Sequence, residues 1–422
     1  MRRLLFSLGF LFGVVLPLVA QQPAPASAAS ASGMPGQSAP NTNPDKPNPF
    51  LTLMQRAVVH AKQHHALTPL LSPIDRTVAP AAFAANAETA ARRLTSETVP
   101  VEALHSIGVR IVPWTTNDPE QMRAVIRTGV DGLISDRPDL LQRVVAEERA
   151  ANPNDPRWKT FVVSAHRGGR GLRPENTLPS FESGLDQLAT ELETDTGVST
   201  DGVSLIWHDQ FYNPQSCRHA DGSPYTLANR TYLRDVSVAQ AQQTFICDKL
   251  HGSAFPDQRN DLTLSPVSVA FSAKEHRPHP YAPTYAAELF RFVRFYVDFY
   301  STGAGKNTPD AAERAANART VRFNIETKLF PNDLPPDVKR MQEPGVPLEL
   351  IQNHTRDPQA FVDALAGTIH REGMEDRCDI QSFDFRTLLL VAEQYPQIPT
   401  VYLTQSPTLL RTAFVPATLR PE

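Results

Sequence analysis

The stretch SAHRGGRGLRPENT, residues 164–177, gathers a histidine, three arginines and a carboxylate around three glycines. Histidine can transfer protons near neutral pH, and arginine binds phosphate with paired hydrogen bonds. The apolar run FVV directly before this stretch predicts a buried strand that would carry these side chains. His166 and Arg167 are therefore candidates for acid–base catalysis and for binding an anionic substrate.

Further along the chain, polar side chains follow other apolar segments. Glu193 and Asp195 stand two apart, as do Glu326 and Lys328, and His208 ends the segment VSLIWHD. Because residues two apart in a strand point to the same face, each pair should project to one side of its strand. Carboxylates, imidazoles and cations in one pocket are typical of a metal-assisted reaction on a phosphate group.

Crowded carboxylates repel one another unless a cation lies between them. An all-oxygen set of ligands favours a hard divalent ion, Ca²⁺ or Mg²⁺, and the absence of thiolate argues against zinc. Such an ion can polarise a phosphoryl oxygen. The remaining phosphate charge would suit Arg167 and Lys328, and two histidines would suit a reaction that removes one proton and delivers another.

The elements that must position these residues alternate between strand and helix patterns. Six strands are predicted after residue 160, near 161–166, 191–195, 203–208, 321–326, 378–383 and 399–403. Two more are predicted within 101–146, and an insertion rich in Tyr, Phe and Pro occupies 209–320. Eight strand–helix units predict an α/β fold, a TIM (β/α)8 barrel, in which catalytic residues lie at the C-terminal ends of the strands.

In their order, these motifs resemble the glycerophosphodiester phosphodiesterase family. The resemblance is specific over 161–210 and 321–328 and looser elsewhere. It implies a TIM barrel that hydrolyses phosphodiesters, usually glycerophosphodiesters, with the help of a metal. The residues that carry it are His166-Arg167-Gly168, Pro174-Glu175-Asn176-Thr177, Glu193 with Asp195 before Asp201-Gly202, His208-Asp209 and Glu326-Thr327-Lys328.

Carried over residue by residue, the resemblance assigns roles. His166 and His208 would be the general acid and base, in an order that the sequence does not decide. Glu193, Asp195 and Glu326 would bind the metal. Glu175 would lie beside it, as a ligand or next to the ligands.

One part of the family pattern stands upstream of its usual place. The family normally ends with a strand that reads roughly Trp-Thr-Val-Asn, a helix and a Thr-Asp-Arg-Pro strand, and similar residues occur here at 114–117 and 135–138. We therefore predict a circular permutation, in which 101–146 supplies strands 7 and 8 and 161–405 supplies strands 1–6. A truncated duplicate domain is the alternative, but it would leave sheet edges exposed. Trp114 would then lie at the rim of the site against the substrate's glycerol part, or be an ordinary core tryptophan.

The first residues predict export. A basic start and the apolar run LLFSLGFLFGVVLPLVA are typical of a signal peptide over 1–20, with a membrane anchor as the alternative. A disordered Pro/Ala/Ser-rich linker is predicted over 21–48, followed by one catalytic domain over 49–422. We expect a secreted or periplasmic protein, in which Cys217 pairs with Cys247 in the insertion; three reduced, buried thiols are the alternative.

Two further patterns bear on partners. The net charge of −4 argues against nucleic acid, so a small-molecule phosphodiester is the expected partner; contact with a membrane is compatible but not required. His60 and His64 are four apart and could share a helical face, but a zinc protease motif would need a glutamate where Ala61 stands. We interpret them as solvated histidines.

Two other functions compete with diester hydrolysis to glycerol phosphate. One is a lyase-type phospholipase on the same barrel, which would release a cyclic phosphate. For that enzyme the aromatic run at 288–300 would form a lipid-facing lip, although an amphipathic helix packed on the barrel is our preferred interpretation of this run. The other is a non-catalytic exported barrel that binds phosphate ligands.

Overall fold

The computed structural model describes residues 47–84, 98–342 and 346–421. The predicted signal peptide at 1–20 and nearly all of the predicted linker at 21–48 lie outside these residues. None of the helices within the described part of the chain has both the length and the apolar character needed to cross a bilayer.

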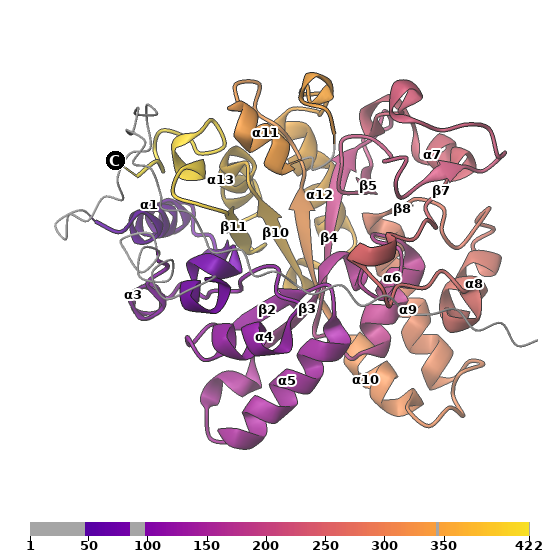
Figure 1. The fold of residues 1–422 in the computed structure, drawn as a ribbon, viewed down its shortest axis with the longest axis horizontal. Helices are drawn as coiled ribbons and strands as arrows, with labels where there is room; N and C mark the ends of the chain where they lie inside the picture. The colour runs from indigo at the N-terminus through magenta and orange to yellow at the C-terminus, as the bar shows by residue number, and fades with distance from the viewer. Residues whose placement is uncertain (1–46, 85–97, 343–345, 422) are drawn as a thin grey trace, which may run out of the picture. The chain divides into compact units, whose positions relative to one another are not determined.

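A ring of eight parallel segments forms the centre of the described structure (Figure 1). From β3 (Val162–Ala165) the order is β4 (Glu191–Val198), β9 (Arg322–Thr327), β10 (Cys378–Ser382), β11 (Thr400–Thr404) and β1 (Leu70–Pro73). Residues 109–114 then follow, joined to β1 by bridges at Leu71–Ile111 and Ile74–Trp114. β2 (Gly132–Ser135) closes the ring, because the N–H of Ile134 donates to the carbonyl of Pro113 on one side and the strand pairs with β3 on the other. The ring confirms the predicted TIM barrel.

Helices surround the ring, and the sequence supplies their starting signals. The side chains of Asn48, Asp118, Thr177 and Asp357 each accept backbone N–H groups at a helix start, and proline follows in the first turn. The helices are α1 (Pro49–Gln63), α3 (Val101–Ser106), α4 (Pro119–Ile126), α5 (Pro138–Ala151), α6 (Leu178–Asp186), α9 (Ala286–Ser301), α10 (Ala311–Thr320), α11 (Pro336–Gln342), α12 (Pro358–Arg371) and α13 (Phe385–Gln394).

The strand prediction was wrong in two places. The segment at 203–208 is not a barrel strand, because β5 (Ser204–Ile206) pairs antiparallel with β4 and with β8 (Thr284–Tyr285). A parallel neighbour would need a crossover of a dozen or more residues, and only a short turn separates β4 from β5. The missing barrel strand is β1, whose four residues are too short to give a clear pattern.

The insertion at 209–320 divides into two parts. Its first part holds the predicted disulfide Cys217–Cys247, which the structure confirms, beside β6 (Arg218–His219), β7 (Phe245–Ile246), α7 (Val238–Thr244) and α8 (Pro266–Lys274). Its last part forms α9 and α10, which belong to the outer helical layer. The aromatic run of α9 buries one face, including Phe290, Phe292 and Tyr296, so the packed amphipathic helix is confirmed and the lipid-facing lip is wrong.

Two further details belong to the described fold. α5 extends to Ala151, shortly before the chain enters β3. Cys378 is a buried free thiol.

Candidate functional site

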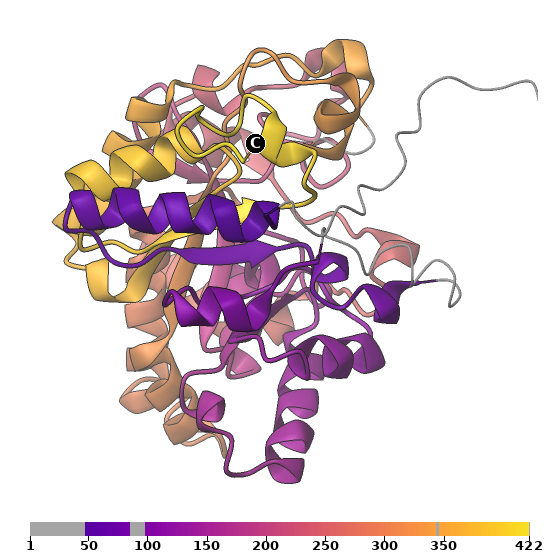
Figure 2. The same cartoon turned by 90° about the vertical axis from the view of Figure 1, so that its left-hand side faces the viewer.

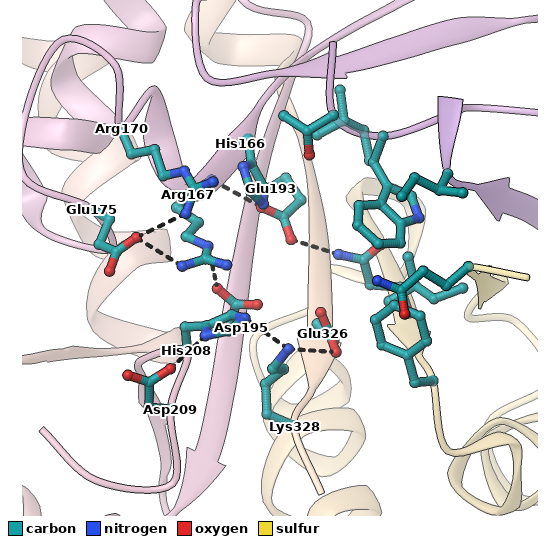
Figure 3. Close-up of a pocket in the computed structure, with 18 of the residues that line it drawn as sticks. His166, Arg167, Arg170, Glu175, Glu193, Asp195, His208, Asp209, Glu326 and Lys328 are labelled. Atoms are coloured by element: carbon teal, nitrogen blue, oxygen red, sulfur yellow. Dashed lines mark hydrogen bonds and ion pairs between the residues drawn. The ribbon is translucent and has the colours of Figure 1, made fainter. Parts of the chain in front are cut away.

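The predicted site residues line one cavity of about 570 Å³ at the C-terminal ends of the barrel strands (Figure 3). β3, β4 and β9 deliver most of these side chains, and the loop after β5 delivers His208. The nine residues singled out from the sequence that line the cavity are Trp114, His166, Arg167, Glu175, Glu193, Asp195, His208, Glu326 and Lys328.

The turn after β3 explains the His-Arg-Gly sequence. Arg167 has a positive φ of 50°, which directs its backbone N–H to Glu193 Oε2 at 2.9 Å. Gly168 has a φ of 82°, and a Cβ there would lie 2.7 Å from the backbone nitrogen of Phe181. Only glycine allows this close approach, which holds the start of α6 against the turn.

Three buried carboxylates form the centre of the cavity. Ligand oxygens of Glu193, Asp195 and Glu326 all lie within 4.8 Å of one another. Burial, together with the charge of Asp195, raises the pKa of Glu193 well above its usual range. Burial also raises the pKa of Glu326 to about 8, although Lys328 Nζ lies 3.2 Å from its Oε1. Acidic oxygens that are this close and buried fit a hard divalent cation, which would relieve their repulsion.

Amide side chains orient two of these carboxylates. Gln381 Nε2 donates to Glu193 Oε1 at 2.6 Å, and Asn176 Nδ2 donates to Asp195 Oδ2 at 2.9 Å. Burial opposes ionisation of Asp195, but Arg167 and the other nearby cations outweigh it and lower its pKa. The Pro-Glu-Asn-Thr segment therefore contributes its asparagine as a support for the candidate metal ligand Asp195.

His166 is held in a defined orientation by an acidic side chain that follows β2. Its Nδ1 lies 2.6 Å from Asp136 Oδ1, and because a carboxylate only accepts, Nδ1 carries the hydrogen. Nε2 then points to the carboxylate cluster, 3.8 Å from Glu193 Oε2. Burial, followed by the charge of Arg170, lowers the pKa of His166 to about 4 against the pull of Asp136. His166 is therefore neutral at neutral pH, with Nε2 available as a proton acceptor.

His208 repeats this arrangement on the other side of the cluster. Its Nδ1 lies 2.7 Å from Asp209 Oδ1, and Asp209 Oδ2 accepts from Asn213 Nδ2 at 2.7 Å. Its Nε2 lies 2.9 Å from Lys328 Nζ, so the imidazole accepts a hydrogen from the ammonium group. Burial and the charges of Arg167 and Lys328 lower the pKa of His208.

The arginines near His166 are joined through Glu175. Arg167 Nη1 donates to Glu175 Oε2 at 2.7 Å, and Arg167 Nε lies 3.4 Å from Asp195 Oδ2. Arg170 donates from Nε to Asp136 at 2.6 Å and from Nη1 to Glu175 at 3.4 Å. Burial acts to raise the pKa of Glu175, but the two arginines outweigh it and lower the value to about 2. Glu175 therefore lies with the arginines, outside the three-carboxylate cluster.

The opposite wall of the cavity is apolar. Trp114 is half-buried, donates from Nε1 to the carbonyl of Ser72 at 3.0 Å, and packs edge to face on Phe383 at 5.6 Å. Ile74, Phe83 and Leu403 also line the cavity. Trp114 is therefore packed against the barrel and forms part of the cavity wall, and its contact with the substrate's glycerol part stays a prediction.

Sequence reasoning assigned no role to several residues that contact the predicted ones. Asp136 and Asp209 belong to the motifs at 135–138 and 208–209, but their contacts with His166 and His208 were not predicted. Ser216 and His251 belong to no such motif, because they come from the insertion and meet in space at 3.0 Å. The missed residues that line the cavity or hold its histidines are Asp136, Arg170, Asp209, Ser216, His251 and Gln381.

Comparison with known proteins gives partial matches. The model of the "Glycerophosphoryl diester phosphodiesterase family" matches residues 48–140 and 166–290. "Lysophospholipase D GDPD3" of Mus musculus is 40% identical over 68 residues, which is 16% of this chain and 21% of that protein. "Glycerophosphodiester phosphodiesterase 1" of Rattus norvegicus is 27% identical over 135 residues, which is 31% of this chain and 39% of that protein. The chain thus spans between a fifth and two fifths of the length of these relatives.

Solved structures match at low identity. A structure from Silicibacter pomeroyi, named as a putative glycerophosphoryl diester phosphodiesterase, has 21% identity and a TM-score of 0.36, covering 56% of this chain and 62% of that one. A phosphodiesterase from Oleispira antarctica, solved with the product sn-glycerol-3-phosphate, has 16% identity and a TM-score of 0.32, covering 57% and 64%.

Proposed function

The chain belongs to the glycerophosphoryl diester phosphodiesterase family, and we propose that it hydrolyses glycerophosphodiesters to an alcohol and glycerol phosphate. One observation carries this proposal. His166 and His208 each have Nδ1 on a carboxylate, and both line the cavity that contains Glu193, Asp195 and Glu326. Two oriented imidazoles beside an acidic cluster are the groups that general acid–base cleavage of a phosphodiester needs.

We propose Ca²⁺ or Mg²⁺ as the cofactor, with Glu193, Asp195 and Glu326 as its ligands. The fit rests on their mutual distances within 4.8 Å and on the raised pKa values that burial causes at Glu193 and Glu326. When bound, such an ion would polarise the phosphoryl oxygen and offset charge in the transition state.

The histidines would carry the two proton transfers. Nε2 of one imidazole removes a proton from water or from a substrate hydroxyl, and the other imidazole, once it has taken up a proton at Nε2, delivers that proton to the leaving alcohol. Asp136 and Asp209 would fix the tautomers and stabilise each imidazolium as it forms. Lys328, within reach of His208 and Glu326, would attract the phosphate charge.

The circular permutation and the cellular location are further parts of the proposal. The pairing of β2 with β3, and of β1 with β11, supports a family barrel whose last strands come first in the chain. The basic start and apolar run at 1–20 support export to a secreted or periplasmic location.

Phosphorus NMR of the products tests the proposed reaction. Glycerophosphocholine or a similar diester, incubated with the protein and Mg²⁺ or Ca²⁺, should give the signal of a glycerol phosphate monoester. A cyclic phosphate signal would instead support the lyase-type phospholipase. Binding without turnover across several diesters would support a non-catalytic barrel, and the His208→Ala variant serves as the control that must lose the product signal.

A further inference from the structure

Away from the catalytic cavity, α1 and α13 pack against each other on the outside of the barrel (Figure 2). His60 lies in the last turn of α1 and His64 caps its C-terminal end. Glu393 faces them from the last turn of α13. Ligand atoms of these three residues all lie within 4.8 Å of one another.

We propose that His60, His64 and Glu393 form a second metal site, which binds a transition-metal dication such as Zn²⁺. Two imidazoles and one carboxylate suit zinc, in contrast to the all-oxygen set of the catalytic cavity. Zinc–ligand bonds of about 2.0–2.1 Å at tetrahedral angles would separate two ligand atoms by about 3.4 Å. His60 Nε2 and Glu393 Oε1 are 3.6 Å apart, which is close to that separation.

The state of His60 supports this proposal independently of the spacing. Its Nε2 is shielded from solvent, so the interpretation of His60 as a solvated histidine was wrong, and this nitrogen has no hydrogen-bond partner among the described residues. A ring nitrogen that is shielded from water and has no partner destabilises the folded protein, and donation of its lone pair to a metal ion would remove this cost. The imidazoles of His60 and His64 lie 4.6 Å apart between ring centres, with ligand nitrogens within 4.8 Å of one another, so both are placed on the same side of the helix end.

The surroundings leave room for further ligands. A cavity of about 500 Å³ adjoins the site between α1, α13 and the C-terminal segment, and His60 and Glu393 line it. The side chain of Glu393 is 39% exposed, so water can reach the ion and complete its coordination. Three protein ligands with an open position form a common zinc arrangement.

The consequence of this site would be structural. α1 comes from the first described part of the chain and α13 from the last, so one ion would cross-link the two. Arg56 of α1 already donates to the carbonyl of Arg420, which holds the C-terminal segment at the same place. An ion that binds only the folded protein would therefore strengthen the junction between the chain's two ends.

Zinc binding to the full-length protein tests this inference. Equilibrium dialysis against Zn²⁺ in a large excess of Mg²⁺, which fills the acidic cluster, should show one more bound zinc for wild type than for His64→Ala. Zinc should also raise the Tm of wild type by about 2–5 °C and leave that of the variant unchanged. Because His64 is exposed, its substitution leaves the packing of α1 intact.

A neighbouring histidine supplies the matched control. His65 is exposed and has a φ of 55°, which asparagine tolerates, so His65→Asn should bind zinc as wild type does. Glu393→Gln should weaken zinc binding at least tenfold. Equal zinc stoichiometry and equal Tm shifts in wild type and His64→Ala would overturn the inference. This outcome is independent of diester hydrolysis, because neither readout uses the catalytic reaction.

Discussion

At the scale of single residues, carboxylates decide what the pocket's imidazoles can do. Asp136 and Asp209 each accept from Nδ1 of a histidine, so Nε2 of His166 faces the acidic cluster and Nε2 of His208 faces Lys328. The sequence predicted both histidines, since each directly follows an apolar strand pattern. It did not predict that Asp136 would hold His166, because that contact depends on β2 lying beside β3.

Removing the charge that orients His166 should therefore impair turnover. Asp136→Asn keeps the shape but can stabilise the wrong tautomer, so we expect kcat to fall by about 10²–10⁴-fold with little change in Tm. Steady-state kinetics and thermal melts of the purified variant measure both quantities. Asp139→Asn, three residues on and paired with Arg137, is the control and should retain wild-type kcat. Equal activity of the two variants would show that Asp136 does not orient a histidine needed for turnover.

The acidic cluster also predicts how stability depends on pH. Folded Glu326, with its pKa near 8, holds a proton that the unfolded chain, with an ordinary value near 4.5, has lost. Folding therefore loses stability as pH rises toward 8, by up to about 1.4 kcal/mol per pH unit for one proton. The lowered pKa of His166 makes stability rise with pH, but only between about pH 4 and pH 6.5. The fall in stability caused by Glu326 should therefore be clearest between pH 6.5 and pH 8.

Thermal melts in a chelator should accordingly show Tm falling across that window. Mg²⁺ or Ca²⁺ should remove much of the fall, since the ion replaces the proton. Buried Glu182 and Glu191, with pKa values near 7, also make Tm fall as pH rises, and the ion does not affect this part of the fall. Glu326→Gln isolates the contribution of the cluster and should have a flatter profile in chelator. A variant profile as steep as that of wild type would contradict the assignment.

At the scale of elements, alternation of strands and helices was predictable and strand identity was not. β3, β4, β9, β10 and β11 lie close to where apolar runs placed them. The run at 203–208 has the same composition, but the short turn before it forces a hairpin with β4. β1 escaped detection because its partners, β11 and residues 109–114, come from distant parts of the chain. Pairing over such distances leaves no local pattern.

The insertion element depends on its disulfide. Cys217 and Cys247 close a loop of 30 residues, which the chain-entropy model values at about 3–4 kcal/mol. Ser216, next to Cys217, lines the cavity and contacts His251. We expect the double substitution Cys217→Ser and Cys247→Ser to lower the stability of the insertion by about that amount and to raise KM more than it lowers kcat.

Urea unfolding and steady-state kinetics measure these effects. Reductant on the wild-type protein should reproduce both changes, whereas reductant on the double variant should add nothing. If the double variant keeps wild-type stability and KM, then the disulfide does not support this wall of the cavity.

At the scale of the whole described molecule, the ring order differs from the chain order. Three consecutive segments of the ring, β1, residues 109–114 and β2, precede β3 in sequence. The motifs at 114–117 and 135–138 predicted two of them, and β1 was the addition. The position of these two segments in the ring was predicted from the motif resemblance, because hydrophobic periodicity alone does not show which strands are neighbours.

A relinked chain tests the permutation. The new protein would run from 153 to 420, then through a linker of about eight residues, then from 47 to 152. Arg56 bonds to the carbonyl of Arg420, and α1 starts about 10 Å before Arg56, so a short linker suffices. Because residues 151–154 are exposed, the new ends should do little harm. We expect a folded monomer-sized species with kcat/KM within about tenfold of wild type, measured by circular dichroism and diester hydrolysis. An unfolded or inactive product would contradict the proposal that the chain is a circular permutation of the family's strand order.

The most direct test of the account is the metal dependence of diester hydrolysis, compared between two glutamates of one strand. Glu193 lies in the acidic cluster, whereas Glu191 lies two residues earlier on β4, equally buried, and lines a cavity at the other end of the barrel. After chelation, wild type and Glu191→Gln should lose turnover and regain it with Mg²⁺ or Ca²⁺, whereas Glu193→Gln should not recover at the same concentrations. Turnover that survives chelation, or a Glu193→Gln variant that recovers like wild type, would contradict the claim that these carboxylates hold the ion for catalysis.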